Sequence, residues 1–131
     1  MARCLIVDDS EAMREIANEH LTALGHEVVE AGDAETALGA LICAPSDGAS
    51  IDLVLLDWDL PGLGALDVLR AAADLAARPE IVLCATEHDP RQLQLAAAAG
   101  ARHHVLKPFD ADAIRQVVAE ALGPAAPEAA A

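Results

Sequence analysis

The sequence predicts an α/β fold, a single doubly wound domain built around a five-stranded parallel sheet. Short runs of leucine and β-branched residues alternate with longer segments of helical periodicity, which is the pattern of successive βα units. Three of the runs are almost continuously apolar, as expected for strands that helices cover on both faces. A length of 131 residues fits one hydrophobic core. The predicted strands are residues 3–7, 27–30, 53–56, 81–85 and 104–106.

A helical segment follows each predicted strand. Ser10 is the expected N-cap of the first helix, and Gly25 is expected just beyond its C-terminal end. Between them, apolar residues recur every three or four positions, which predicts one buried helix face. Gly100 marks the end of the fourth helix in the same way. The predicted ranges after the first helix are residues 34–43, 65–76, 91–99 and 111–122.

The ordered domain is predicted to span residues 1–122. Residues 45–50 form an expected loop between the second helix and the third strand. Residues 123–131 are rich in proline and alanine and have little to bury, so a disordered tail is expected there. We expect no second domain.

The chain is strongly acidic, with 8 Lys and Arg residues, 22 Asp and Glu residues and a net charge of −14. Such a charge repels phosphate backbones and anionic lipids, so neither nucleic acid nor a membrane surface is an expected partner. No window of about 18 residues lacks charge, and the N-terminus has no signal-peptide core, so a cytoplasmic location is expected. The three cysteines lack CxxC spacing and are expected to be reduced thiols.

Polar side chains stand at the ends of four predicted strands. Because open α/β sheets bind ligands at the carboxyl ends of their strands, we expect these side chains to share one rim. Three carboxylates within about 4–6 Å would repel by roughly 3–4 kcal/mol per pair at an effective dielectric constant near 20, which indicates a bound cation such as Mg²⁺. A cation, a lysine and one spare carboxylate suit phosphoryl transfer, with Asp57 as the nucleophile. The residues at these ends are Asp8, Asp9, Asp57, Thr86 and Lys107.

The strand ends carry longer motifs. Residues 7–10 read VDDS, residues 56–62 read LDWDLPG, residues 84–89 read CATEHD and residues 107–110 read KPFD. In order and spacing these motifs resemble the receiver domain of two-component response regulators, and most of all the single-domain, chemotaxis-type receivers. The similarity covers residues 1–122, nearly the whole chain. It implies a flavodoxin-like (βα)5 fold with the strand order 2-1-3-4-5.

The resemblance also implies a role for each site residue. Asp57 would accept the phosphoryl group from a histidine kinase or a phosphotransfer protein. Asp9 and Asp57 would bind Mg²⁺ directly. Asp8 would bind the ion through a water molecule, and Asp59 through its backbone carbonyl. Lys107 would pair with the Asp57 carboxylate and later with the phosphoryl group.

Two positions depart from the family pattern. Counting back from Lys107, the family's switch hydroxyl corresponds to Ala85, whereas Thr86 lies one residue later. Either a one-residue deletion places Thr86 at the switch position, or the switch hydroxyl is absent. The position of the switch aromatic, three residues before Lys107, holds His104. This substitution would weaken or alter the usual coupling between phosphorylation and partner binding.

The leading hypothesis is a stand-alone receiver that acts as a diffusible phosphorylation switch, not as an enzyme with a substrate of its own. The fourth helix, the fifth strand and the fifth helix would form one face of the domain. Phosphorylation would change the affinity of this face for a protein partner. The partner would be a flagellar motor switch, a kinase or a phosphotransfer protein. A monomer is expected, with a symmetric dimer through the last helices as the alternative.

Two other functions stay open at this point. A receiver-like binding module that is never phosphorylated is favoured by Ala85 and His104, although the retained acids and lysine count against it. A phosphatase of the haloacid dehalogenase type is favoured by Asp57 and Asp59, which stand two residues apart at a strand end. Against it, that family carries its acidic pair downstream of the nucleophile, whereas here the pair comes first.

Overall fold

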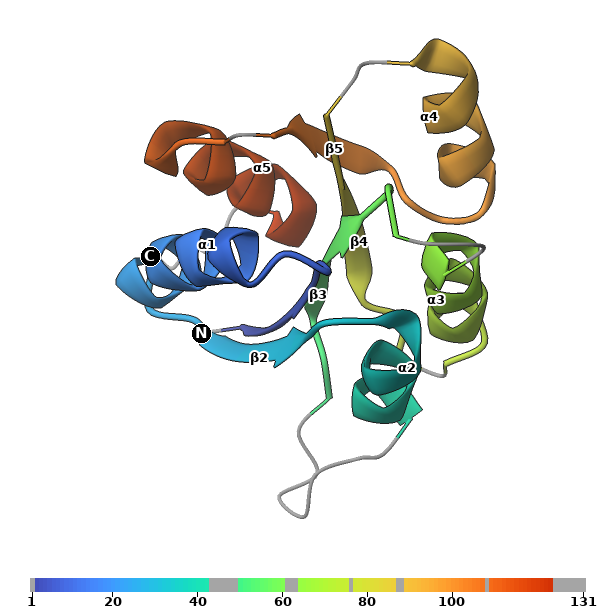
Figure 1. The fold of residues 1–131 in the computed structure, drawn as a ribbon, viewed down its shortest axis with the longest axis horizontal. Helices are drawn as coiled ribbons and strands as arrows, with labels where there is room; N and C mark the ends of the chain where they lie inside the picture. Colours follow the sequence, from blue (N-terminus) through green and yellow to red (C-terminus); the bar gives the residue numbers. More distant parts are fainter. Residues whose placement is uncertain are drawn as a thin grey trace.

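A five-stranded parallel sheet forms the centre of the molecule (Figure 1). The computed structural model describes residues 2–42, 50–60, 64–75, 77–86, 89–107 and 109–123. The strands lie in the order β2-β1-β3-β4-β5, and every neighbouring pair is parallel, so the predicted fold class and strand order are confirmed. The strands are β1 (Arg3–Val7), β2 (Glu27–Ala31), β3 (Leu53–Asp57), β4 (Glu80–Ala85) and β5 (His103–Leu106).

Helices cover both faces of the sheet, as Figure 1 shows. Two of them, the first and the fifth, lie together on one face, and the other three lie on the opposite face. This two-sided arrangement explains why the central strands are apolar along their whole length. The helices are α1 (Glu11–Ala23), α2 (Ala34–Ile42), α3 (Gly64–Ala73), α4 (Pro90–Ala98) and α5 (Ala111–Leu122).

The hydrophobic core has two layers because successive side chains of a strand point to opposite faces. In β1, Ile6 belongs to the layer that includes Leu21 of α1 and Ile114 of α5. Its neighbour Leu5 belongs to the other layer, with Leu69 of α3. Each fully buried side chain of this size contributes about 1.5–3 kcal/mol relative to an exposed one, so the two layers fix the sheet between its helices.

Two cysteines lie inside these layers. Cys4 in β1 and Cys84 in β4 are buried and unpaired, as expected for reduced thiols. Burial raises the pKa of each thiol to about 12. The third cysteine, Cys43, where the second helix was predicted to end, lies outside the described residues.

The first helix begins and ends where the sequence predicts. The side chain of Ser10 accepts a hydrogen bond from the backbone N–H three residues later at 3.3 Å, and Gly25 has a φ of +90° just beyond the last turn. Leu21 is fully buried, but Ile16 and Leu24 are each 37% exposed. The buried face of α1 is therefore narrower than the periodicity predicts.

The boundaries of the third and fourth helices differ from the predicted ranges 65–76 and 91–99 by one to three residues. The third helix was predicted to reach residue 76 but ends at Ala73, because the N–H of Asp74 bonds the carbonyl of Ala71 and closes a tighter turn. The fourth helix begins one residue early, at Pro90, because the side chain of Asp89 caps it and proline suits the first helical position.

The predicted loop and tail concern segments that are mostly outside the described residues, namely 43–49 and 124–131. Within the described ranges, no helix is both long enough and apolar enough to cross a lipid bilayer.

Candidate functional site

Two buried carboxylates mark the carboxyl edge of the sheet. Asp57 is the last residue of β3, Asp8 directly follows β1, and their residues are 2% and 4% exposed. Among the described residues, Asp8 and Asp57 are the only polar or charged ones that are buried. The edge lies where the strand order changes direction, between β1 and β3, which is the usual ligand position in open α/β sheets.

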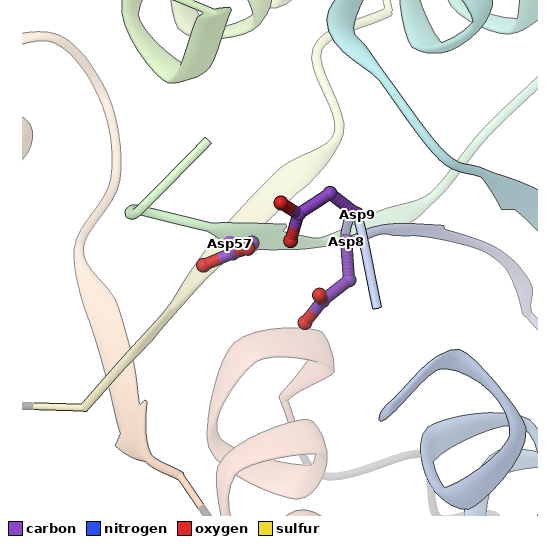
Figure 2. Close-up of side chains that lie close together, drawn as sticks. All are labelled: Asp8, Asp9 and Asp57. Atoms are coloured by element: carbon purple, nitrogen blue, oxygen red, sulfur yellow. The ribbon is translucent and has the colours of Figure 1, made fainter. Parts of the chain in front are cut away.

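A third carboxylate completes an acidic cluster. Asp9 is exposed, and ligand oxygens of Asp8, Asp9 and Asp57 all lie within 4.8 Å of one another. Figure 2 shows the two neighbouring side chains leaving the end of β1 in different directions, with the carboxylate of Asp9 turned to the side of Asp57. Three hard oxygen donors at this spacing fit a small divalent cation that keeps part of its water shell.

Lys107 reaches the cluster from the residue after β5. Its ammonium nitrogen lies 3.0 Å from Oδ2 of Asp8 and 3.1 Å from Oδ1 of Asp57, and its side chain is only 10% exposed. The position of Lys107 follows from strand pairing, because its backbone N–H bonds the carbonyl of Ala85 at 2.8 Å. The sequence prediction that these four residues converge is confirmed.

One oxygen of Asp57 carries the contacts that the structure shows for this carboxylate. Oδ1 accepts the backbone N–H of Asp59 at 2.9 Å and also contacts the Lys107 ammonium. Both contacts therefore go to the same oxygen, and no residue in the described part of the chain donates a hydrogen bond to Oδ2. Asp59 itself is exposed, and its backbone is held against Asp57 by this hydrogen bond.

The charges of the site shift the pKa values of its groups. Burial raises the pKa of Asp57, and the charge of Asp8 adds to this, although the Asp59 amide and Lys107 work against it. For Lys107, burial alone would lower the pKa, but the hydrogen bonds and charges of Asp8 and Asp57 outweigh it and raise the pKa. The lysine is therefore firmly cationic at neutral pH.

The register of strand β4 bears on the switch hydroxyl. Ala85 is the last residue of β4 and pairs with Leu106, so Thr86 comes directly after the strand, opposite Lys107. Thr86 is exposed, and its hydroxyl donates a hydrogen bond to Oδ2 of Asp59 at 3.4 Å. The side chain at the edge of the site is thus the threonine, whereas Ala85 is buried in the sheet.

His104 lies on a different surface from the acidic cluster. It is an exposed residue of β5 and lines a shallow groove of about 240 Å³ between this strand and α4. The groove residues from α4 are Leu93, Gln94 and Ala97. The expected switch position therefore faces the groove at the α4–β5 edge.

Two residues next to the site were missed at the sequence level. Gln92 of α4 accepts a hydrogen bond from the indole N–H of Trp58 at 2.9 Å. Arg14 of α1 donates to the backbone carbonyl of Asp8 at 2.7 Å. The available signal for Arg14 was its basic side chain, one turn into the helix that follows the acidic pair. Nothing in the sequence marks Gln92.

Residues 4–119 match the family described as the response regulator receiver domain. The chain belongs to this family. The chemotaxis protein CheY of Pseudomonas aeruginosa is 36% identical over 119 residues, which cover 88% of this chain and 92% of the relative. CheY of Bacillus subtilis is 31% identical over 120 residues, which cover 92% and 97% of the two chains.

Solved structures agree with this assignment. The chemotaxis protein CheY4 of Vibrio cholerae superposes with a TM-score of 0.82 at 27% identity, covering 93% of this chain and 99% of the other. The receiver-domain resemblance and the CheY-like flavodoxin fold are thereby confirmed. As a receiver domain, the protein belongs to two-component signalling, and its acidic cluster lies where the family has its acidic pocket.

Proposed function

We propose that this receiver is a phosphorylation switch. Asp57 accepts a phosphoryl group from a histidine kinase or a phosphotransfer protein in a Mg²⁺-dependent reaction, and the phosphorylated form changes its binding to a protein partner. The proposal places the protein in the cytoplasm. The observation that carries it is the position of Lys107, which contacts both buried carboxylates beside Asp9.

The donor set suits magnesium. Asp9 and Asp57 would bind the ion directly, Asp8 would bind it through water, and the backbone carbonyl of Asp59 would be a further ligand. When bound, the ion supplies positive charge that offsets the carboxylates and the oxygens of the incoming phosphoryl group. The fit rests on the mutual 4.8 Å spacing of three carboxylate oxygens, which is a costly arrangement without cations.

The transfer uses groups already oriented in the site. Oδ2 of Asp57 attacks phosphorus, so that an O–P bond forms while the P–N bond to the donor histidine breaks, and the bonding electron pair returns to the imidazole, which takes up a proton. Oδ1 stays oriented by the Asp59 amide. Lys107 offsets part of the charge of about −1.5 to −2 that the attached phosphoryl group carries.

Two hydrogen bonds support a route from the site to the output surface. Thr86 is bonded to Asp59 in this structure, and a phosphoryl group on Asp57 competes for its hydroxyl. The residue after Asp57, Trp58, is bonded to Gln92 of α4. A change at Asp57 therefore has direct connections to the end of β4 and to α4.

The proposed partner surface is the α4–β5–α5 face. Leu95 of α4 is 56% exposed and Leu106 of β5 is 44% exposed, so each of these two elements offers a large apolar side chain to a partner. The groove lined by His104 lies between the same two elements. We propose a protein such as a flagellar motor switch, a kinase or a phosphotransfer protein as the partner, because the chain resembles chemotaxis proteins named CheY.

The test is the reaction of the protein with a small phosphodonor. With Mg²⁺ and acetyl phosphate, we expect a hydroxylamine-labile acyl phosphate that peptide mass spectrometry locates at Asp57. Asp57→Asn should abolish the adduct. Asp67→Asn makes the same charge change on the exposed surface of α3 and should leave the adduct unchanged.

Other outcomes of this experiment would replace the proposal. Steady hydrolysis of phosphate monoesters would favour a phosphatase. A protein that forms no adduct with acetyl phosphate or beryllofluoride, with or without Mg²⁺, would be a binding module whose partner affinity does not depend on phosphorylation.

A further inference from the structure

Arg14 of α1 holds the backbone of the acidic pair. Its Nη1 donates to the carbonyl oxygen of Asp8 at 2.7 Å, and its side chain is only 17% exposed. A hydrogen bond of this length from a guanidinium is charge-assisted and about twice as strong as a neutral one. The carbonyl belongs to the peptide unit that joins Asp8 to Asp9. Since that unit is planar, fixing the carbonyl also fixes the start of Asp9.

The remaining polar atoms of Asp8 are also held. Its N–H donates to the carbonyl of Ala31 at the end of β2 at 3.1 Å, and its Oδ1 accepts the N–H of Ser10 at 2.8 Å. Its Oδ2 accepts from Lys107. The bond from Arg14 therefore completes the fixation of Asp8, whereas Asp9 depends on the direction in which this peptide leaves the strand.

The orientation of Arg14 is itself determined by β2. Its Nε lies 3.2 Å from Oε1 of Glu30, and Oε2 of Glu30 accepts from Asn18 of α1 at 2.8 Å. Space for the guanidinium comes from Gly32, where a Cβ atom would lie 3.2 Å from Nη1. An arginine, a carboxylate and a glycine from three segments thus form one support behind the turn that carries Asp8 and Asp9.

We propose that Arg14 is a positioning residue of the metal site, which orients the peptide between Asp8 and Asp9 so that Asp9 turns toward Asp57. This inference rests on the proposed Mg²⁺-dependent function. The positioning by Arg14 and the positive charge of Arg14 have opposite effects on Mg²⁺ affinity, so the inference can be tested. A cation beside three carboxylates disfavours a second cation, so loss of the charge alone would tighten Mg²⁺ binding, whereas loss of the positioning weakens it.

The experiment measures Mg²⁺ affinity by calorimetry and by the fluorescence of Trp58, the single tryptophan of the sequence. Arg14→Met should weaken Mg²⁺ binding about tenfold, since it removes a charge-assisted bond from a partly buried group. Arg14→Lys keeps the charge but cannot reach Asp8 and Glu30 together, so a loss of about threefold is expected. The rate of beryllofluoride adduct formation should return to the wild-type value at saturating Mg²⁺.

Matched variants separate positioning from general destabilisation. Glu30→Gln and Gly32→Ala disturb the support of Arg14 and should weaken Mg²⁺ binding in the same direction. Glu27→Gln makes the same change at the far end of β2, where Glu27 pairs with Arg3, and Gly39→Ala fills open space on α2. Both controls should bind Mg²⁺ like the wild type. If Arg14→Met does not fold, the Glu30 and Gly32 variants carry the test.

The outcomes distinguish this inference from the proposed function. Unchanged or tighter Mg²⁺ binding by folded Arg14→Met, or equal losses in the test and control variants, would overturn the positioning role while leaving the switch intact. A wild-type protein without measurable Mg²⁺ affinity would overturn both.

Discussion

The ammonium group of Lys107 lies 3.1 Å from Oδ1 of Asp57, and both side chains are almost fully buried at the edge of the sheet. The same ammonium group contacts Asp8 at 3.0 Å. One lysine from the end of β5 therefore holds carboxylates that come from β1 and β3. The positive charge of Lys107 therefore holds the two carboxylates together without a metal ion.

Lys107→Met is expected to lower the free energy of unfolding by about 3 kcal/mol in metal-free buffer, because it leaves two buried carboxylates without their cation. Urea unfolding with a chelator present measures the effect. Arg102→Met is the control, since it removes a 73% exposed partner of Glu80 and should change the free energy by less than about 1 kcal/mol. Similar losses in both variants would contradict the structural role of Lys107.

Asp57→Asn is expected to stabilise the metal-free protein at neutral pH. Burial raises the pKa of Asp57 in the folded protein above 3.8, so folding disfavours the ionised form. The folded state then binds the proton more tightly than the unfolded state, and stability is lost as the pH rises through the raised pKa. The advantage of the asparagine variant should therefore shrink as the pH falls towards 3.8.

Unfolding free energies of the wild type and Asp57→Asn, measured between acid and neutral pH with a chelator, check this prediction. Asp67→Asn serves as the control for net charge, since Asp67 is an exposed residue of α3. An advantage of Asp57→Asn that grows on acidification would have the wrong sign and would refute the assignment.

Thr86→Ala is expected to spare formation of the Asp57 adduct and to weaken the conformational response. The hydroxyl of Thr86 contacts Asp59, not Asp57, in this structure, so it has no part in the attack on phosphorus. A net hydrogen bond of about 1 kcal/mol corresponds to about fivefold in the equilibrium between the two conformations. Amide hydrogen exchange of α4 and β5, with and without beryllofluoride, measures the response.

Thr86→Ser retains the hydroxyl and should respond like the wild type. A full response in Thr86→Ala would mean that this residue is not the switch hydroxyl. Because Ala85 is buried and has no hydroxyl, the response would then need no hydroxyl at the end of β4.

Gln92→Leu is expected to uncouple α4 from Trp58, the residue after Asp57. Leucine has no amide oxygen that could accept the indole N–H of Trp58, which donates at 2.9 Å in the wild type. The adduct should form normally, the emission of Trp58 should shift, and the beryllofluoride-induced change in hydrogen exchange of α4 should decrease. Gln94→Leu, two residues further along the same helix, is the control. Identical behaviour of the two variants would exclude a specific role for the Trp58 contact.

The sequence predicts the centre of the sheet well because the central strands are recognisable from their apolar composition. Leu53 to Leu56 are all buried, and a run of four such residues has no polar face to expose. The convergence of Asp57 and Lys107 is also predictable, because Asp57 ends one parallel strand and Lys107 directly follows another. The roles of these residues in phosphorylation are not fixed by geometry and stay predictions.

Other features depend on contacts that a local pattern cannot contain. The exposure of Ile16 depends on how closely neighbouring elements approach α1, which periodicity does not reveal. The contact of Arg14 with Asp8 requires Glu30 and Gly32, which come from β2 and the segment after it. The position of Thr86 directly after β4 depends on the pairing of β4 with β5. A count along the sequence cannot decide whether Ala85 or Thr86 takes the switch position.

Burial of Cys4 and Cys84 affects how readily these two thiols react. Burial raises the pKa values of Cys4 and Cys84 far above neutral pH, so both groups stay protonated, and the reactive nucleophile of a cysteine is its thiolate. We therefore expect these two cysteines to react slowly with oxidants. Cys84 stands opposite Asp57 in the pairing of β4 with β3, so a sulfur that resists oxidation lies next to the proposed phosphorylation site.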